Sequence, residues 1–407
     1  MRAYRRKGGV RHSVRGVSCL ADRGAQRTDA PYLLLLIFFS AAANGFAAET
    51  NLQSAPKFLG MNSCSSSSCH GGAADKRDEC VIFAKRDFHS RAFATLTTAR
   101  SERMAEFLGI KSAMTDASCT SCHAPFQTVP SALQANKLDI TKGVSCESCH
   151  GPAEDWIRSH TRPDFTREDR VHAGMRDLKN LYVRANACVA CHQNVPTKLL
   201  AAGHPELIFE LDGQGVSQPK HWTEAVDWNG AQAWLVGQAV ALREMSWQLA
   251  NENSPSEKEI NRFEGLVWLV HRASEVDEQF SKSSDSNFRP AKENFEKAQK
   301  WSDELAKAAA NISWNNELTR KLLTALADAH SGINDSVGQS VQARRAERLV
   351  VALERLVLAS NNKVKLATDS ELNELFSQVQ SLPDFDAKKF ATTLEKFSAK
   401  VAKNFSE

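Results

Sequence analysis

The chain has 407 residues, of which 42% are apolar and 24% are charged, and it contains ten cysteines. These fractions are ordinary for a folded globular protein, so they exclude wholesale disorder and a polytopic membrane protein. At about 150 residues per domain, the length predicts two or three domains. All ten cysteines lie at or before Cys191, so any cysteine chemistry is confined to the first half of the chain.

The first 47 residues are predicted to be a secretory signal peptide. Residues 1–30 hold eight Lys or Arg and two acidic residues, and the apolar run Leu33–Phe39 follows them. Small residues then lead to Ala47, after which we expect cleavage. The apolar run is shorter than the ~20 residues of a spanning helix, and an uncleaved membrane anchor is the alternative. Cleavage predicts a periplasmic or otherwise exported protein, and it removes Cys19.

The leader also accounts for the basic charge of the chain. The formal net charge is +3 for the whole sequence; residues 1–30 contribute +6 and residues 31–47 contribute nothing, which leaves −3 for the mature chain. We see no basis for nucleic-acid binding, and we expect membrane association only through an uncleaved leader.

Four pairs of cysteines are each followed at once by a histidine. Three pairs have the spacing Cys-x-x-Cys-His and begin at Cys119, Cys146 and Cys188. The first pair, Cys64 and Cys69, has four intervening residues, which is a looser variant of the pattern. In c-type haem attachment, two thiols add to the vinyl groups of haem and the adjacent imidazole binds the iron. The pattern therefore predicts four covalently attached haem c groups.

The predicted haem sites use eight of the ten cysteines. The attachment cysteines are Cys64, Cys69, Cys119, Cys122, Cys146, Cys149, Cys188 and Cys191, and the proximal histidines are His70, His123, His150 and His192. Disulfides and a Cys/His zinc ribbon are the alternatives. Disulfides would not need a histidine after every pair, and the exported compartment and the immediate Cys-His step argue against zinc. Cys80 is left over, and its apolar neighbours predict a buried free thiol.

Seven further histidines could bind the opposite faces of the irons. Those in the segment with the cysteine pairs are the candidate distal ligands: His89, His160, His204, His221 and, more weakly, His172. Two imidazoles on one iron give a low-spin haem suited to electron transfer, whereas a haem without a sixth ligand is open to a substrate. His271 and His330 are expected to be structural. Ligation by Met104, Met114 or Met175 is an alternative, but nothing in the sequence singles one out.

The third cysteine pair stands in a distinctive block, Val144–Pro152, which is followed by His160. This block, together with Asp87–Phe93 after the first pair and Arg176–Leu178 before the last, resembles the cytochrome c-554 family of tetrahaem cytochromes. The resemblance covers roughly residues 57–224. The segments 201–210 and 219–222 are similar to a related branch of exported multihaem cytochromes.

This resemblance implies distal ligands for two haems. By analogy with the family, His160 would bind the iron of the His70 haem, and His89 would bind the iron of the His192 haem.

The resemblance is less definite for the other two haems. It implies that His204 or His221 would bind the iron of the His150 haem. In the family the second haem is five-coordinate, which corresponds to His123 here, but spare histidines such as His172 put that open position in doubt. The four-residue spacer of the first pair and the long C-terminal region also depart from the family.

The cysteine-free half is predicted to be an all-α bundle. The spacing of apolar residues predicts a helix over 231–251, and Ser256 with Glu259 forms a capping box that opens the next helix. Further helices are expected near 291–312, 315–330 and 337–360, followed by a last helix over 386–405. Thr368 with Glu371 predicts a second capping box that opens a helix to Leu382. Residues 281–287 are the expected linker.

We therefore expect a mainly α protein with two domains after the leader. Residues 48–224 are predicted to form a multihaem cytochrome c domain of short helices and loops packed on haems, with each cysteine motif at an end of a short helix. Residues 225–407 are predicted to form an α-helical domain without a metal, nucleotide or catalytic-triad motif. A structural cap on the haem domain is its simpler role, and a docking surface for a redox partner or a dimer interface is the alternative.

Closely spaced haems predict a carrier that transfers electrons between other redox proteins, with no catalytic residue assigned. The alternative is an oxidoreductase that acts on a small nitrogen or sulfur compound at an open haem, for which the haem of His123 is the candidate. A third interpretation is an exported scaffold or sensor, in which the helical half binds a partner and the haems report redox state.

Overall fold

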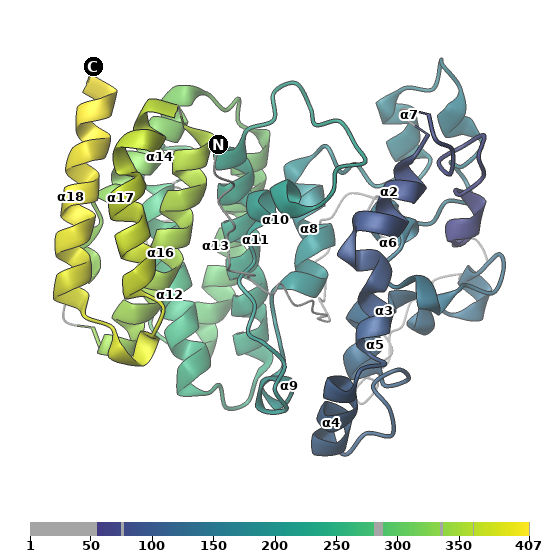
Figure 1. Cartoon of the computed structure of the whole chain (residues 1–407), viewed down its shortest axis with the longest axis horizontal. Coiled ribbons are helices and arrows are strands. Elements are labelled where there is room, and N and C mark those ends of the chain that lie inside the picture. Colours follow the sequence, from purple (N-terminus) through teal and green to yellow (C-terminus); the bar gives the residue numbers. More distant parts are fainter. Residues whose placement is uncertain (1–54, 75–76, 281–287, 334–336, 361, 407) are drawn as a thin grey trace, which may run out of the picture. The chain divides into compact units, whose positions relative to one another are not determined.

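The computed structural model describes residues 55–74, 77–280, 288–333, 337–360 and 362–406, and it is mainly helical, as predicted (Figure 1). Its described residues fall into two compact units. The motif unit comprises the described part of Met1–Asp177 with Ala190–Ile208, and the helical unit comprises Leu178–Val189 with the described part of Phe209–Glu407. The predicted leader and the predicted linker at 281–287 lie outside the described residues.

The motif unit consists of short helices, 3-10 turns and loops. Its helices are α2 (Glu79–Arg86), α3 (Ala92–Thr95), α4 (Ala99–Leu108), α5 (Ala117–His123), α6 (Cys146–His150), α7 (Arg167–His172) and α9 (Thr197–Ala201). Its buried side chains form two small clusters, one around Phe58 and Phe126 and one around Leu96. An isolated β-bridge joins Phe58 to Gln134.

Helix α8 (Leu181–His192) crosses the division between the units, which falls between Val189 and Ala190. The predicted domain boundary at residue 224 differs from this division. Residues 178–189 and 209–224 group with the helical unit because side chains such as Leu181 and Phe209 are buried in its core.

The helical unit is a bundle built around helix α11 (Gly230–Asn251), most of whose residues are buried. Its helices are α10 (Leu211–Ser217), α11 (Gly230–Asn251), α12 (Glu257–Ser274), α13 (Lys292–Asn311), α14 (Asn316–Ala327), α15 (His330–Ile333), α16 (Gln339–Ala359), α17 (Asn362–Gln378) and α18 (Ala387–Ser406). Helix α11 packs against α10, α12, α13 and α16, and Trp234, Leu235 and Leu242 on it are wholly buried. A helix that is apolar on most sides needs such a central position.

Most of the predicted helices of this unit are present within a few residues of their expected ends. The capping box at the start of α12 is confirmed: the Glu259 backbone N–H donates to the Ser256 hydroxyl at 3.3 Å, and the Ser256 backbone N–H donates to the Glu259 carboxylate at 2.9 Å. The capping box at Thr368 is wrong. Helix α17 continues through this residue, and the buried Thr368 hydroxyl donates to the Val364 carbonyl at 2.8 Å, one turn earlier.

Among the described helices, none combines the length and the apolar composition that crossing a bilayer requires.

Candidate haem sites

The four cysteine motifs occupy different local structures. The first lies in turns after the 3-10 helix Met61–Ser63, the second ends α5, the third forms α6, and the fourth ends α8. Two of the four motifs therefore end a helix, as expected, and the third is itself a short helix. Six of the predicted attachment cysteines, Cys64, Cys69, Cys119, Cys122, Cys146 and Cys149, are free thiols. They are therefore available for thioether bonds.

The first and third motifs lie side by side in the motif unit. The Cys146 thiol interacts with the thiols of Cys64 and Cys80, and these interactions lower the pKa of Cys146 to about 3. The same interactions and burial raise the pKa of Cys64 and of Cys80. Cys80 is buried and free, as its sequence context predicted.

Glu147 is the second residue of the third cysteine motif. It connects this motif to the segment that precedes the first cysteine motif. Its carboxylate is buried and accepts the backbone N–H groups of Leu59 at 3.0 Å, Gly60 at 2.7 Å and Ala153 at 2.8 Å. Burial raises the pKa of Glu147, although the three N–H bonds act in the opposite direction. The glutamate therefore fixes two loops to helix α6.

Both ends of α6 are held by nearby residues. Before the helix, Gly143 has a φ of 64°, and a Cβ on it would lie 2.5 Å from the His89 carbonyl oxygen, so this close approach requires glycine. After it, the Arg176 guanidinium donates to the carbonyls of Ser148 at 2.9 Å and Cys149 at 2.7 Å. These bonds satisfy carbonyls that the end of a helix leaves without partners.

Five histidines in the motif unit share one hydrogen-bonding pattern, in which Nδ1 has an oxygen partner. The partners are Glu79 Oε2 for His70 (2.9 Å), Asp87 Oδ1 for His89 (2.9 Å), and the carbonyls of Ala92 for His123 (3.0 Å), Trp156 for His160 (3.2 Å) and Pro205 for His204 (3.0 Å). A carbonyl or an ionised carboxylate can only accept, so Nδ1 carries the proton and Nε2 carries the lone pair with which an imidazole binds a metal.

The structure brings four of the predicted ligands together in two pairs. The rings of His70 and His160 have centroids 6.1 Å apart and planes 21° apart. The rings of His89 and His192 have centroids 5.9 Å apart and planes 76° apart. A metal–imidazole bond of about 2 Å, with about 1.1 Å from nitrogen to ring centre, puts two imidazoles on opposite faces of one metal about 6 Å apart. The centroid distance in both pairs therefore matches that of two imidazoles on one metal.

The remaining candidates lie elsewhere. His123 is half-buried, and burial lowers its pKa, which favours the neutral form that binds a metal. Among the described residues, its ring makes no contact with a second imidazole. His150 ends α6 and His204 follows α9, both in the motif unit. His172 is exposed at the end of α7.

His221 belongs to the helical unit, and its ring lies 5.1 Å from that of Trp222. Its Nδ1 is buried without a hydrogen-bond partner in the described part of the chain.

Several residues of these sites were not singled out from the sequence. Glu79 and Asp87 orient His70 and His89, and Glu147 and Arg176 hold α6. For Asp87 a signal existed, because an acidic residue two positions before a histidine can accept from both its backbone and its ring. Within the described ranges, no group of three or more His, Cys, Asp or Glu side chains is arranged to hold a bare metal ion.

Comparison with known proteins supports the haem assignment for part of the chain. Residues 63–151 match the family model described as cytochrome c554 and c-prime, which confirms the predicted resemblance for this segment. The match includes the first three cysteine motifs and His89, and it implies covalently bound haem c. No curated protein and no solved structure matches the chain.

Proposed function

We propose that the chain is an exported tetrahaem c-type cytochrome that transfers electrons between other redox proteins. The match of residues 63–151 to the family model described as cytochrome c554 and c-prime supports this proposal. The observation that carries the proposal is the pairing of His70 with His160 and of His89 with His192 at about 6 Å. Two imidazoles on one iron leave no position for a substrate, so such haems serve electron transfer.

The chain's own residues would set the properties of these two haems. When bound, haem iron supplies the site that gains or loses one electron. The carboxylates of Glu79 and Asp87 accept the Nδ1–H bonds of one imidazole in each pair. A carboxylate acceptor makes the imidazole more basic, which favours the oxidised iron and lowers its reduction potential.

For the His150 haem we propose His204 as the distal ligand. Both residues lie in the motif unit, and the Pro205 carbonyl accepts from Nδ1 of His204, so Nε2 carries the lone pair with which this imidazole would bind iron. His221 is the second candidate for this position, and it belongs to the helical unit.

The number of haems tests this proposal. A pyridine haemochrome assay of the purified mature chain is expected to give four haems. The double variant Cys64→Ser and Cys69→Ser should give three, because a serine cannot form the thioether bond. The control Cys80→Ser should keep four, since Cys80 is not assigned to a haem. Three haems in the unaltered protein would contradict attachment at the first motif.

One observation favours a second candidate function, an oxidoreductase acting on a small nitrogen or sulfur compound at the haem of His123. In the described part of the chain, the ring of His123 contacts no other imidazole, unlike the rings of His70 and His192. A haem held only by His123 would have an open face for such a compound.

Ligand binding distinguishes the two functions. If one face is open, the reduced protein is expected to bind carbon monoxide at about one haem of the four and to show a matching high-spin signal when oxidised. Purely low-spin spectra without carbon monoxide binding would exclude the enzyme.

A further inference from the structure

The helix that carries the fourth cysteine motif is packed into the helical unit. On α8, Leu181, Ala185 and Val189 lie four residues apart and are buried in the core of that unit. This spacing places them on one face of the helix. Cys188, one of the predicted attachment cysteines, is half-buried and packs against the same core.

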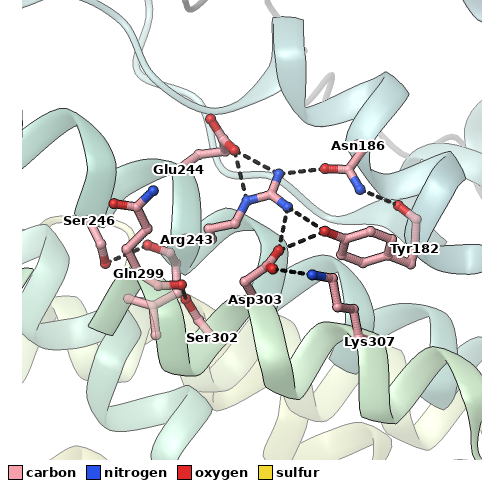
Figure 2. Close-up of polar contacts among 10 residues, drawn as sticks. Tyr182, Asn186, Arg243, Glu244, Ser246, Gln299, Ser302, Asp303 and Lys307 are labelled. Atoms are coloured by element: carbon pink, nitrogen blue, oxygen red, sulfur yellow. Dashed lines mark hydrogen bonds and ion pairs between the residues drawn. The ribbon is translucent and has the colours of Figure 1, made fainter. Parts of the chain in front are cut away.

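A polar network joins a second face of α8 to helices α11 and α13 (Figure 2). Arg243 on α11 donates to the Asn186 side chain, to the Tyr182 hydroxyl at 3.2 Å, to Asp303 at 2.8 Å and to Glu244 at 2.7 Å. The Tyr182 hydroxyl donates to Asp303 at 2.7 Å. Only 11% of the Arg243 side chain is exposed, so these bonds are largely shielded from water.

The electrostatic environment of this network keeps the Tyr182 hydroxyl protonated and the Asp303 carboxylate ionised. Burial raises the pKa of the Tyr182 hydroxyl, so the hydroxyl keeps its proton and donates. Burial also opposes ionisation of Asp303, but Arg243 and Lys307 outweigh it and hold the pKa of that carboxyl below its usual value. The network is therefore fixed with Asp303 as an anion between two cations.

A third contact holds the remaining side of α8. Arg184 donates to both carboxylate oxygens of Glu224, at 3.2 and 2.9 Å, and to the Leu178 carbonyl at 2.6 Å. The Trp222 indole N–H donates to the same carboxylate at 2.8 Å. Three separate contacts thus fix the position and the rotation of the helix within this unit.

We propose that the helical unit serves to position the fourth haem, and that Arg243 is the positioning residue that holds α8 through Tyr182 and Asn186. The inference rests on the proposed function, because it requires a haem on Cys188, Cys191 and His192. The proposal gives the cysteine-free half of the chain the role of positioning one of the protein's own haems. Arg243 is suited to this role because its guanidinium can bind four side chains at fixed angles, which a lysine cannot do.

Electron paramagnetic resonance can distinguish this haem from the His70–His160 haem. Near-parallel imidazole planes, as in the His70–His160 pair, split two d orbitals of ferric iron. Near-perpendicular planes, as in the His89–His192 pair, leave these orbitals almost equal in energy and give a broader, more anisotropic signal. The signature of the haem on α8 is therefore expected to differ from that of the His70–His160 haem.

The test uses full-length, haem-loaded protein with Arg243→Met. We expect the anisotropic signal to shift or to be lost and one component of the redox titration to move, while the signal of the His70–His160 haem stays unchanged. Asn186→Ala, which removes a single contact from the α8 side, should give a smaller shift of the same signal, and it decides the question if Arg243→Met does not fold.

Arg344→Met is the matched control, because Arg344 is equally shielded and pairs with Glu347 at 2.7 Å in the same unit. This variant should leave all haem signals unchanged, even if it melts earlier. Unchanged signals and potentials in both Arg243→Met and Asn186→Ala would overturn the inference. Absence of a haem on Cys188 and Cys191 in the unaltered protein would instead overturn the proposed function itself.

Discussion

Replacing His89 with alanine is expected to convert one low-spin haem of the ferric protein to high spin. The His89 ring faces that of His192 with centroids 5.9 Å apart, and Asp87 holds its Nδ1–H at 2.9 Å, so Nε2 is the atom left for iron. Alanine has no donor atom, and water or an open position would take its place. The change should appear as a new high-spin absorption band and as the loss of the anisotropic low-spin signal.

His172→Ala is the matched control for this experiment. His172 is exposed at the end of α7, and we expect its removal to leave the number of low-spin haems unchanged. If His89→Ala keeps all its low-spin haems, then His89 is not an axial ligand. If His172→Ala loses a low-spin haem, then His172 is an axial ligand, which would contradict our assignment.

The second large effect concerns the pH dependence of stability in the helical unit. Glu210 is buried, and Gln238 donates to its carboxylate at 3.0 Å. Burial and the neighbouring Asp212 raise the pKa of Glu210 to about 8, although Arg348 and Arg355 oppose the shift. Burial raises the pKa of Asp212 to about 6, against the same opposing effect of Arg355. The two carboxyls titrate as an interacting pair.

Because both folded-state pKa values lie above those of the unfolded chain, the protonated carboxyls stabilise the folded state. Their contribution is complete below about pH 4 and is lost as the pH rises through about 6 and then about 8. At about 1.4 kcal/mol per pKa unit, the pair should lower the free energy of unfolding by a few kcal/mol over this range.

Glu210→Gln tests this expectation in urea unfolding measured between pH 5 and pH 9. The amide stays neutral, so the fall in the free energy of unfolding between about pH 6 and pH 9 should be much smaller than in the unaltered chain. Glu317→Gln is the control, since Glu317 is half-exposed and paired with Arg320, and its pH profile should match that of the unaltered chain. Equal slopes in the unaltered protein and in Glu210→Gln would contradict the prediction.

The long helices were predictable because their signals are local. The apolar spacing of 231–251 and the Ser256–Glu259 capping box involve residues within a few turns of one another, and both gave the right elements. The pattern at Thr368 failed because the same hydroxyl can bond back to a carbonyl inside a continuing helix, and packing around the buried side chain decided between the two. The grouping of residues 178–189 with the helical unit was not predictable, since it depends on contacts with residues far along the chain.

The candidate haem sites also contain some residues with a local sequence signal and others that depend on distant contacts. Attachment cysteines and proximal histidines are set by covalent spacing, so the sequence could indicate them directly. The oxygen partners of the imidazoles include backbone carbonyls such as that of Ala92, 31 residues from His123, and a carbonyl has no sequence signature. The Tyr182–Asp303 bond joins residues 121 positions apart, and nothing in either local sequence identifies the other.

The Nδ1–H bonds of the paired histidines have a consequence for the speed of electron exchange. Under the proposed ligation, the rings of His70, His89 and His160 are already locked by their oxygen partners, so a change in the charge of the iron requires little nuclear rearrangement. A small reorganisation energy lowers the activation barrier of each transfer. Exchange between neighbouring haems should then be limited by distance and driving force, with only a weak dependence on temperature.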